Sequence, residues 1–227
     1  MIKKHIPNAI TCANLFSGCI GIVYAFNGAL ETAAYFVLLS GVFDFFDGMV
    51  ARALNVKSPI GKELDSLADM VSFGFLPGVV LFKLLSVSDF SSDYLPYLGF
   101  VVTVFSALRL AKFNIDTRQT EDFIGLNTPM NTLLIVSLPF IQKDYPQIIE
   151  STLFLLTLTV VLSWLLISEI RIFSMKLSNL SWEHNKYKYL FLICSIALIM
   201  VLKFVAVPFI LLLYIGFSIA HFKKIKA

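Results

Sequence analysis

The sequence predicts an all-α fold, a polytopic bundle of about eight transmembrane helices with both termini in the cytoplasm. Of the 227 residues, 58% are hydrophobic and only 15% are charged, and the mean hydropathy is +0.82. This apolar share is well above that of a typical soluble domain. The apolar runs are continuous rather than alternating, which argues against a membrane β-barrel.

Eight apolar runs approach the length that a bilayer requires, since a spanning helix needs about 20 apolar residues. We therefore expect helices at 8–27, 30–54, 60–87, 94–115, 127–142, 150–172, 187–203 and 205–221. The run at 127–142 is the least apolar, because it begins with Asn127, Thr128 and Pro129. The last two runs could instead form one kinked helix across 203–208, which would leave seven spans.

The distribution of basic residues favours eight spans over seven. With eight, Lys83, Lys143 and Lys203 lie outside, and the remaining fifteen of the 18 Lys and Arg lie on the side of the termini. This asymmetry is the positive-inside pattern of a multi-pass protein. We expect the protein in the cell (inner) membrane. No repeat or long hydrophilic insert divides the chain, so we expect residues 1–227 to form one membrane domain.

Acidic residues interrupt the second predicted span near its cytoplasmic end. Asp44, Asp47, Gly48 and Ala51 follow one another at helical spacing and so share one face, with Arg52 at the edge of that face. The glycine and the alanine leave room for a ligand to approach the helix. The guanidinium of Arg52 is suited to binding phosphate.

The third predicted span brings a second acidic pair. Asp65 and Asp69 are four residues apart, with Gly61 one turn before them and Ser72 just after. The connection at 55–59 is short, so we expect the second and third helices to be antiparallel neighbours. All four carboxylates then converge near the cytoplasmic surface, where the active site would face the cytoplasm.

Four carboxylates this close cannot all ionise without a counter-charge. Ionisable groups inside membrane spans are costly and mark functional sites by default. Mg²⁺ or Mn²⁺ is the most suitable counter-charge, because both prefer oxygen ligands and commonly bind phosphate oxygens as well. No histidine lies near the cluster in the sequence, which argues against zinc or di-iron. The residues therefore predict metal-dependent chemistry at a diphosphate.

The spacing from Asp44 to Asp69 reads Asp-x2-Asp-Gly-x2-Ala-Arg-x8-Gly-x3-Asp-x3-Asp. This pattern is identified as the signature of the CDP-alcohol phosphotransferases. The resemblance covers about 5–176, and the helices at about 187–221 add little to it. It implies transfer of a phosphatidyl or related group from a CDP-linked donor to an alcohol, with release of CMP. It also implies a homodimer.

The resemblance assigns roles to particular residues. It implies that Asp44, Asp47, Asp65 and Asp69 hold one or two divalent cations, and that Asp69 is the general base for the incoming hydroxyl. The implied donor site for the cytidine diphosphate consists of Gly48, Ala51, Arg52 and Gly61. Asn8 and Thr11 match the N-terminal pattern of the family and could contact the nucleotide, although helix capping accounts for them equally well.

The flanking residues resemble the phosphatidylserine synthase branch of the family. The matching stretches are 65–77 and 108–114, where the branch usually has arginine in place of Lys112. The branch implies CDP-diacylglycerol as donor and L-serine as acceptor, and no nucleic-acid partner. Serine carries a carboxylate and an ammonium, so we expect its site to offer cations and acceptors: Ser72, Arg109, Lys112 and Asn114. For Lys112, anchoring at the membrane surface is an open alternative.

Two other functions remain open at this stage. One is the same chemistry with glycerol 3-phosphate or inositol as the acceptor, because the signature does not select the alcohol. The other is a cation transporter that uses the acidic cluster as its ion site. The absence of a sequence repeat and the position of the charges toward one surface disfavour a transporter. Whether the alcohol attacks phosphorus directly or through an aspartyl intermediate also stays open.

Overall fold

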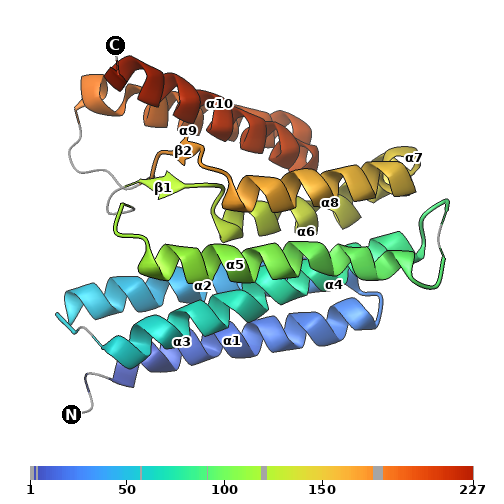
Figure 1. Ribbon diagram of the computed structural model, residues 1–227, viewed down its shortest axis with the longest axis horizontal. Helices are drawn as coiled ribbons and strands as arrows, with labels where there is room; N and C mark the ends of the chain where they lie inside the picture. The colour runs from blue at the N-terminus through green and yellow to red at the C-terminus, as the bar shows by residue number, and fades with distance from the viewer. Residues whose placement is uncertain are drawn as a thin grey trace.

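The computed structural model describes residues 3, 5–56, 58–90, 92–118, 122–175 and 181–226. Long helices run side by side over most of these ranges, and the one sheet of the described chain is a pair of two-residue strands (Figure 1). The elements are α1 (His5–Phe26), α2 (Leu30–Ala53), α3 (Pro59–Asp69), the π-helix η2 (Met70–Phe75), α4 (Leu76–Ser86), the 3₁₀-helix η3 (Leu95–Phe100), α5 (Val101–Ile115), β1 (Phe123–Ile124), α6 (Thr128–Asp144), α7 (Pro146–Ile149), α8 (Thr152–Ile167), β2 (Arg171–Ile172), α9 (Trp182–Leu202), the 3₁₀-helix η4 (Lys203–Val205) and α10 (Ala206–Lys226).

The predicted all-α membrane bundle is confirmed. Five helical segments of the described chain are long and apolar enough to cross a membrane. They are His5–Phe26, Leu30–Ala53, Pro59–Ser86, Leu95–Ile115 and Asn185–Lys223, the last of which comprises α9 and α10. The helix α8 is apolar but shorter.

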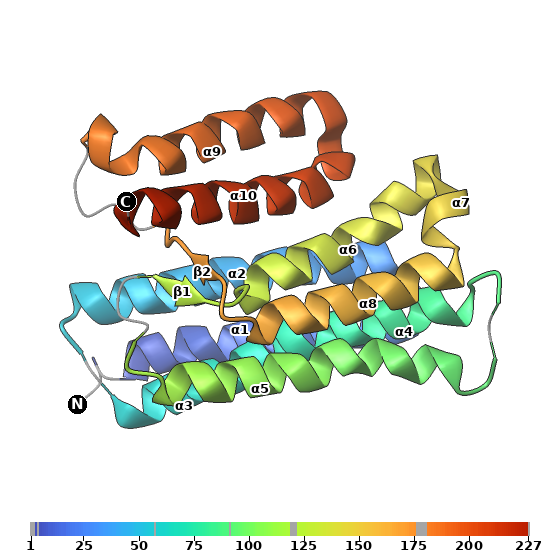
Figure 2. The same ribbon diagram turned by 45° about the horizontal axis from the view of Figure 1, so that its top comes forward.

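The helices α3, η2 and α4 follow one another as one continuous rod. This rod and α1 lie at the side of the bundle that carries the acidic residues. The helix α1 packs along α2 and also against α3, η2 and α4. At the opposite side, α10 packs on α6 and β2, and α9 packs on α10 (Figure 2). The start of α1 and the end of α10 lie at the same end of the molecule (Figure 1).

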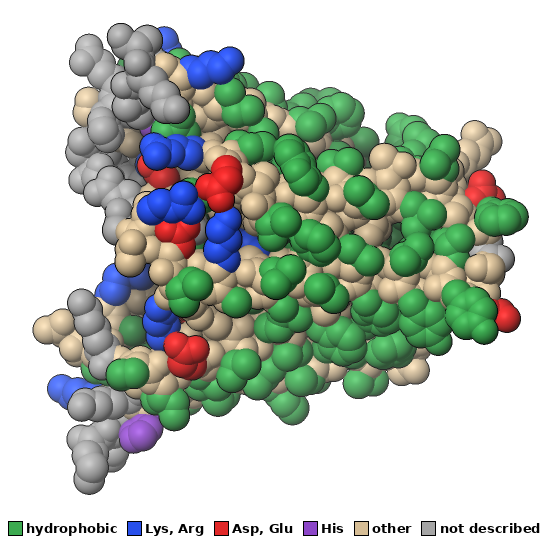
Figure 3. All heavy atoms as spheres, in the orientation of Figure 1, with side chains coloured by type: hydrophobic (Ala, Val, Ile, Leu, Met, Phe, Trp, Pro, Cys, Tyr) green, Lys and Arg blue, Asp and Glu red, His purple; other side chains and the backbone are tan. Residues whose placement is uncertain are grey.

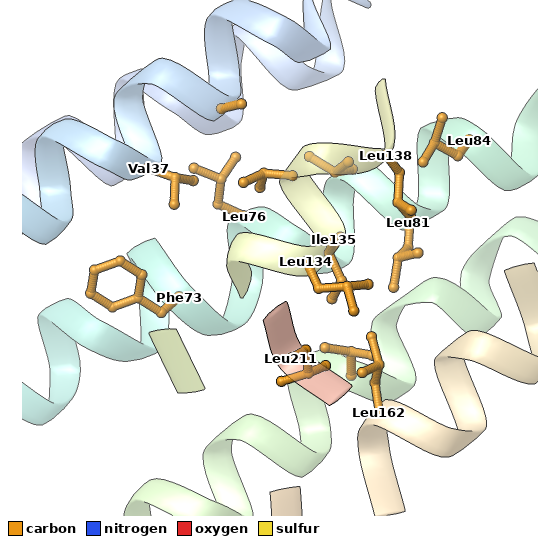
Figure 4. Packing of buried hydrophobic residues seen from close by; sticks show 14 of the residues in the cluster. Val37, Phe73, Leu76, Leu81, Leu84, Leu134, Ile135, Leu138, Leu162 and Leu211 are labelled. Carbon is orange, nitrogen blue, oxygen red and sulfur yellow. The ribbon is translucent and has the colours of Figure 1, made fainter. Parts of the chain in front are cut away.

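The apolar core is centred on the α3–η2–α4 rod, which is the most buried of the five long segments. Leucine, isoleucine and valine side chains of α2, α4, α6, α8 and α10 meet there (Figure 4). The labelled members are Val37, Phe73, Leu76, Leu81, Leu84, Leu134, Ile135, Leu138, Leu162 and Leu211. The rod that carries Asp65 and Asp69 is thus held in place by the packing of its buried apolar residues from Phe73 to Leu85.

Two groups of polar residues at the edges of predicted spans, near Ser58 and Asn127, cap the first turns of helices. The Ser58 hydroxyl accepts a hydrogen bond from the Gly61 N–H (3.3 Å) at the start of α3, where Pro59 occupies the first turn. The Asn127 side chain likewise accepts from the Met130 N–H (3.0 Å) at the start of α6. The polar residues at 127–129 are therefore the beginning of a helix rather than a break in a span.

Two expectations about the C-terminal part need correction. The predicted helix 150–172 ends early, because α8 stops at Ile167 and the chain becomes extended. Arg171 and Ile172 then pair antiparallel with β1, and the Gly125 N–H donates to the Ile170 carbonyl (2.8 Å). The hydropathy of this segment cannot reveal a strand partner that lies 49 residues earlier, as Phe123 does for Ile172.

The single kinked helix considered for 187–221 is wrong. The chain reverses at η4, where Lys203 adopts a positive φ of 50°, and α10 runs back along α9 (Figure 2). The two-helix prediction is the one that the structure confirms.

A carboxylate fastens the loop between α4 and η3 to the start of α8. Asp89 accepts hydrogen bonds from the backbone N–H (2.8 Å) and the hydroxyl (2.7 Å) of Thr152. In return, the N–H of Asp89 donates to the carbonyl of Glu150 (2.9 Å). This end of the bundle lies opposite the end where α1 begins (Figure 1).

Gly99 allows the close approach of η3 to α4, and its replacement tests that packing. A Cβ at Gly99 would lie 2.6 Å from the backbone nitrogen of Phe82 and 3.0 Å from the carbonyl carbon of Leu81. Backbone atoms cannot move aside cheaply, so we expect Gly99→Ala to destabilise the fold by about 1–3 kcal/mol. Thermal unfolding in detergent should show a lower midpoint. The matched control is Gly216→Ala in α10, where a Cβ meets nothing within 4 Å; equal midpoints for the two variants would contradict the expectation.

Candidate active site

Three carboxylates from two helices come together at one end of the bundle. Asp44 and Asp47 of α2 and Asp65 of α3 each offer an oxygen atom, and these three atoms all lie within 4.8 Å of one another. Oxygen donors at this spacing fit a single hard divalent cation such as Mg²⁺ or Mn²⁺. Among the described residues, no histidine or cysteine belongs to this group. The donor set therefore agrees with the oxygen-liganded site that the sequence predicts.

The first helix fixes the position of Asp47 in α2. The Thr11 hydroxyl lies 2.6 Å from a carboxylate oxygen of Asp47, whose side chain is buried. The helix α1 packs against both α2 and α3. The expectation that α2 and α3 pack directly on each other needs correction, because both pack mainly on α1, and α1 brings the two acidic pairs together.

Asp69 is one turn beyond Asp65 and is not a member of the three-carboxylate group. One of its oxygens accepts a hydrogen bond from the side-chain amide of Asn14 (3.4 Å). The fourth predicted metal ligand therefore lies beside the cluster and is held by α1.

Asn14 is a functional candidate that stands in the same first-helix pattern as Asn8 and Thr11, although the pattern assigns it no role. It is completely buried, and its carbonyl accepts hydrogen bonds from the hydroxyls of Ser40 (3.2 Å) and Ser72 (3.1 Å). It therefore connects α1 to α2 and to η2 as well as to Asp69. A signal for it exists, because Asn14 follows Thr11 at the same spacing of three residues by which Thr11 follows Asn8.

A pocket of about 270 Å³ opens beside the cluster, between α1, α2 and the start of α3. It is lined by Pro7, Asn8, Thr11, Asp47, Gly48, Ala51, Val56, Ser58, Gly61, Lys62 and Asp65. Five of the six residues predicted for the donor site are in this lining. The sixth, Arg52, is exposed and folds back along its own helix, with its guanidinium next to Gly48.

Three of the four residues predicted for the acceptor each have a different partner. Arg109 is buried and donates to the hydroxyl of Thr128 (3.2 Å). Lys112 forms an ion pair with Glu169 (2.6 Å) in an exposed position. The side-chain amide of Asn114 donates to the hydroxyl of Ser66 on α3 (2.9 Å).

Ser72 and Arg109 also have structural contacts of their own. Ser72 is fully buried, and its hydroxyl is engaged with the carbonyl of Asn14. The guanidinium of Arg109 lies 5.2 Å from the ring centre of Phe113 and 5.9 Å from that of Phe123, at cation–π distance.

Charged side chains gather at the end of the molecule that carries the site, and hydrophobic side chains cover most of the rest of the face shown in Figure 3. Lys83, Lys143 and Lys203 fall at the ends of α4 and α6 and in η4, which are at the opposite end of the bundle (Figure 1). This arrangement follows the asymmetry that the sequence predicts.

Comparisons with known proteins agree with the signature. The family model described as CDP-alcohol phosphatidyltransferase matches residues 4–168. The CDP-diacylglycerol–serine O-phosphatidyltransferase of Bacillus subtilis is 36% identical over 141 residues, which are 60% of this chain and 76% of that protein. The protein with the same name from Helicobacter pylori strain 26695 is 34% identical over 169 residues, 73% of this chain and 70% of that protein. The archaetidylserine synthase of Methanothermobacter thermautotrophicus is 32% identical over 136 residues, 58% of this chain and 56% of that protein.

Proposed function

Because this chain belongs to the CDP-alcohol phosphatidyltransferase family, we propose that it transfers the phosphatidyl group of CDP-diacylglycerol to L-serine, giving phosphatidylserine and CMP. The observation that carries the proposal is the group of Asp44, Asp47 and Asp65 beside a pocket lined by the predicted donor residues. Serine as the acceptor is supported by the names of the relatives, two of which act on serine by their printed names.

The pocket between α1, α2 and α3 receives the cytidine diphosphate. Gly48, Ala51 and Gly61 keep the two facing helices free of bulky side chains there. Asn8 and Thr11 supply polar groups from α1, and Thr11 also holds Asp47 in place. Arg52 reaches the diphosphate after turning away from Gly48. The acyl chains of the donor stay in the bilayer, beside the exposed apolar surface of the helices.

The carboxylates divide into two roles. Asp44, Asp47 and Asp65 would hold a divalent cation, Mg²⁺ or Mn²⁺, with Asp69 at the edge of its site. When bound, such a cation neutralises the diphosphate and stabilises the charge that develops on the departing CMP. Asp69 takes the proton of the serine hydroxyl while the oxygen of that hydroxyl bonds to the phosphorus of the phosphatidyl group. The bond from this phosphorus to CMP breaks in the same step.

Direct attack by the alcohol is the simpler scheme for these residues. Asn14 holds Asp69 through a hydrogen bond, which orients the carboxylate for accepting a proton. Among the described residues, no cysteine or histidine that could act as a nucleophile belongs to the carboxylate group.

Arg109 is the best placed of the predicted acceptor residues. It is a buried cation, so it suits the carboxylate of serine. We retain Ser72, Lys112 and Asn114 as predicted acceptor residues whose side chains would need to exchange the partners they have here. Of these, Lys112 is tied to Glu169 and Asn114 to Ser66.

The carboxylate end of the bundle faces the cytoplasm of the cell, with the protein in the inner membrane. This orientation gives soluble serine and metal ions access to the site, and it places most lysines and arginines on the cytoplasmic side. A homodimer is part of the same proposal and is supported by the family resemblance.

The deciding experiment offers serine, glycerol 3-phosphate and inositol separately to purified protein with CDP-diacylglycerol, with and without Mg²⁺ or Mn²⁺. We expect metal-dependent release of CMP that serine supports far better than the other two alcohols. If a different alcohol supports the release of CMP best, the phosphatidyl transfer stands and that alcohol, rather than serine, is the acceptor. Cation flux in proteoliposomes without CDP-diacylglycerol, and no release of CMP, would favour the transporter instead.

Narrowing the donor pocket should weaken donor binding specifically. Ala51→Leu places a larger side chain in the pocket lining, so we expect the KM for CDP-diacylglycerol to rise about tenfold, the effect of roughly 1.4 kcal/mol. The KM for serine should change little. The matched control is Ala53→Leu, an exposed position two residues further along α2. If the two variants have the same KM for CDP-diacylglycerol, the donor does not bind in this pocket.

A further inference from the structure

The rod formed by α3 and α4 does not continue as a regular α-helix through the active site. Residues 70–75 form a π-helix, and the N–H of Leu76 donates to the carbonyl of Val71, five residues earlier. Asp69 is the residue directly before this π-turn. Such turns are rare and occur frequently at functional sites.

Side chains from other helices hold the carbonyl groups of the π-turn. The Thr132 hydroxyl of α6 lies 2.6 Å from the carbonyl oxygen of Phe73, and the Thr103 hydroxyl of α5 donates to the carbonyl of Gly74 (3.0 Å). Thr132 is fully buried and also lies 2.9 Å from its own-helix carbonyl at Thr128, so its single proton is shared between two acceptors. Without these hydroxyls, buried carbonyls of the π-turn would lose partners, which is costly.

The π-turn sets the direction in which the carboxylates of the rod point. A π-turn adds one residue to a helix, and each residue of an α-helix corresponds to a rotation of about 100°. Downstream of the turn, Leu76, Val79 and Val80 are completely buried and fix the rotation of α4. A regular α-helix through 70–75 would therefore turn Asp65 and Asp69, upstream, away from α1 and α2.

We propose that Thr132 and Thr103 are positioning residues, whose hydroxyls hold the π-turn at 70–75 and thereby aim Asp65 and Asp69 at the reaction site. Neither threonine lines the donor pocket or belongs to the carboxylate group. Their effect is exerted through the backbone of the rod. The activity part of the proposal rests on the proposed function, whereas the metal-binding part does not.

The test compares Thr132→Val, Thr103→Val, Thr132→Ser and a control in the full-length protein. Valine keeps the shape of threonine and removes the hydroxyl, and serine retains the hydroxyl. The control is Thr159→Val on α8, where a buried hydroxyl donates to the carbonyl of Leu155 within its own helix (2.8 Å). The readouts are kcat and KM for CMP release, and Mn²⁺ binding followed by electron paramagnetic resonance.

We expect Thr132→Val to lower kcat at least about tenfold, since small misplacements of catalytic groups have large effects on rate. The KM for CDP-diacylglycerol should change less than kcat does, because α1 and α2 also line the donor pocket and are not turned with the rod. Mn²⁺ should bind several-fold more weakly, because Asp65 is one of the three carboxylates. Thr103→Val should shift the same quantities in the same direction, and Thr132→Ser should resemble the wild type.

Two results would overturn the proposal. One is that Thr132→Val and Thr103→Val match Thr159→Val in both kcat and Mn²⁺ affinity. The other is that Thr132→Ser is as impaired as Thr132→Val, which would mean that side-chain shape rather than the hydroxyl matters. If Thr132→Val does not fold, Thr103→Val and Thr132→Ser decide by the same criteria. If the wild type releases no CMP with any alcohol, the proposed function fails, and the Mn²⁺ affinities still decide whether the threonines position the site.

Discussion

Asp69→Asn is expected to release CMP from CDP-diacylglycerol and serine at least about 100-fold more slowly than the wild type, because loss of a positioned general base typically costs 10²–10⁴-fold. The amide has nearly the shape of the carboxylate and can still bond to Asn14, so the fold should be preserved. It cannot accept the proton of the serine hydroxyl. Steady-state assays with labelled donor measure the effect, which should appear in kcat rather than in the KM for the donor.

Two further measurements make the Asp69 result specific. Mn²⁺ binding should remain within a few-fold of the wild type, because Asp69 is outside the three-carboxylate group. Asp93→Asn, in the exposed loop between α4 and η3, is the matched control for the loss of one negative charge and should leave kcat unchanged. Near-normal turnover of Asp69→Asn would remove this residue from the role of base.

Asp47→Asn is expected to lose both Mn²⁺ binding and CMP release, each by at least about 100-fold. Mutation of groups that merely support metal ligands already costs 10–100-fold, so removal of a ligand charge should cost more. Asp47 is buried and accepts from Thr11, and the amide oxygen of asparagine can keep that hydrogen bond. Electron paramagnetic resonance of bound Mn²⁺ gives the affinity, and the assay above gives the rate.

The contrast between the two variants separates the two carboxylate roles. Asp69→Asn should keep the cation and lose the rate, whereas Asp47→Asn should lose both. Glu63→Gln, an exposed position on α3, controls for a change of charge close to the site. Retained Mn²⁺ affinity in Asp47→Asn would mean that the cation is held by other residues.

The convergence of the acidic residues could be predicted because it depends on local geometry. Spacings of three and four residues place Asp44 and Asp47 on one face of a helix, and likewise Asp65 and Asp69. A short connection then brings the two helices back to the same end of the bundle. The donor pocket follows from the same reasoning, since its small residues occupy the same faces.

The acceptor residues show where nearness in sequence misleads. Lys112 and Asn114 follow Arg109 by three and five residues, and each residue of a helix turns by about 100°. Asn114 is therefore about 140° away from Arg109 around α5, and it faces α3 while Arg109 faces α6. Helix geometry alone predicts that Arg109 and Asn114 lie on different faces of α5. It does not identify the residues of α3 and α6 that they contact.

The groups that hold the π-turn could not be predicted, because they lie far away in the sequence. Thr132 is 59 residues beyond Phe73, and Thr103 is 29 residues beyond Gly74. Nothing in the hydropathy of 60–87 distinguishes a regular helix from one with an added residue. The early end of α8 has a similar cause, since the strand partner of Ile172 is Phe123.

The carboxylate that fastens the far end of the bundle has a consequence for acid tolerance. The N–H and the hydroxyl of Thr152 lower the pKa of Asp89 below its ordinary value, because they stabilise its ionised form. The contribution of Asp89 to folding is therefore complete above about pH 4 and is lost only as the pH falls through the lowered pKa. Under the proposed orientation this loop meets the medium outside the cell membrane, so mild acidification there leaves the attachment of α8 unchanged.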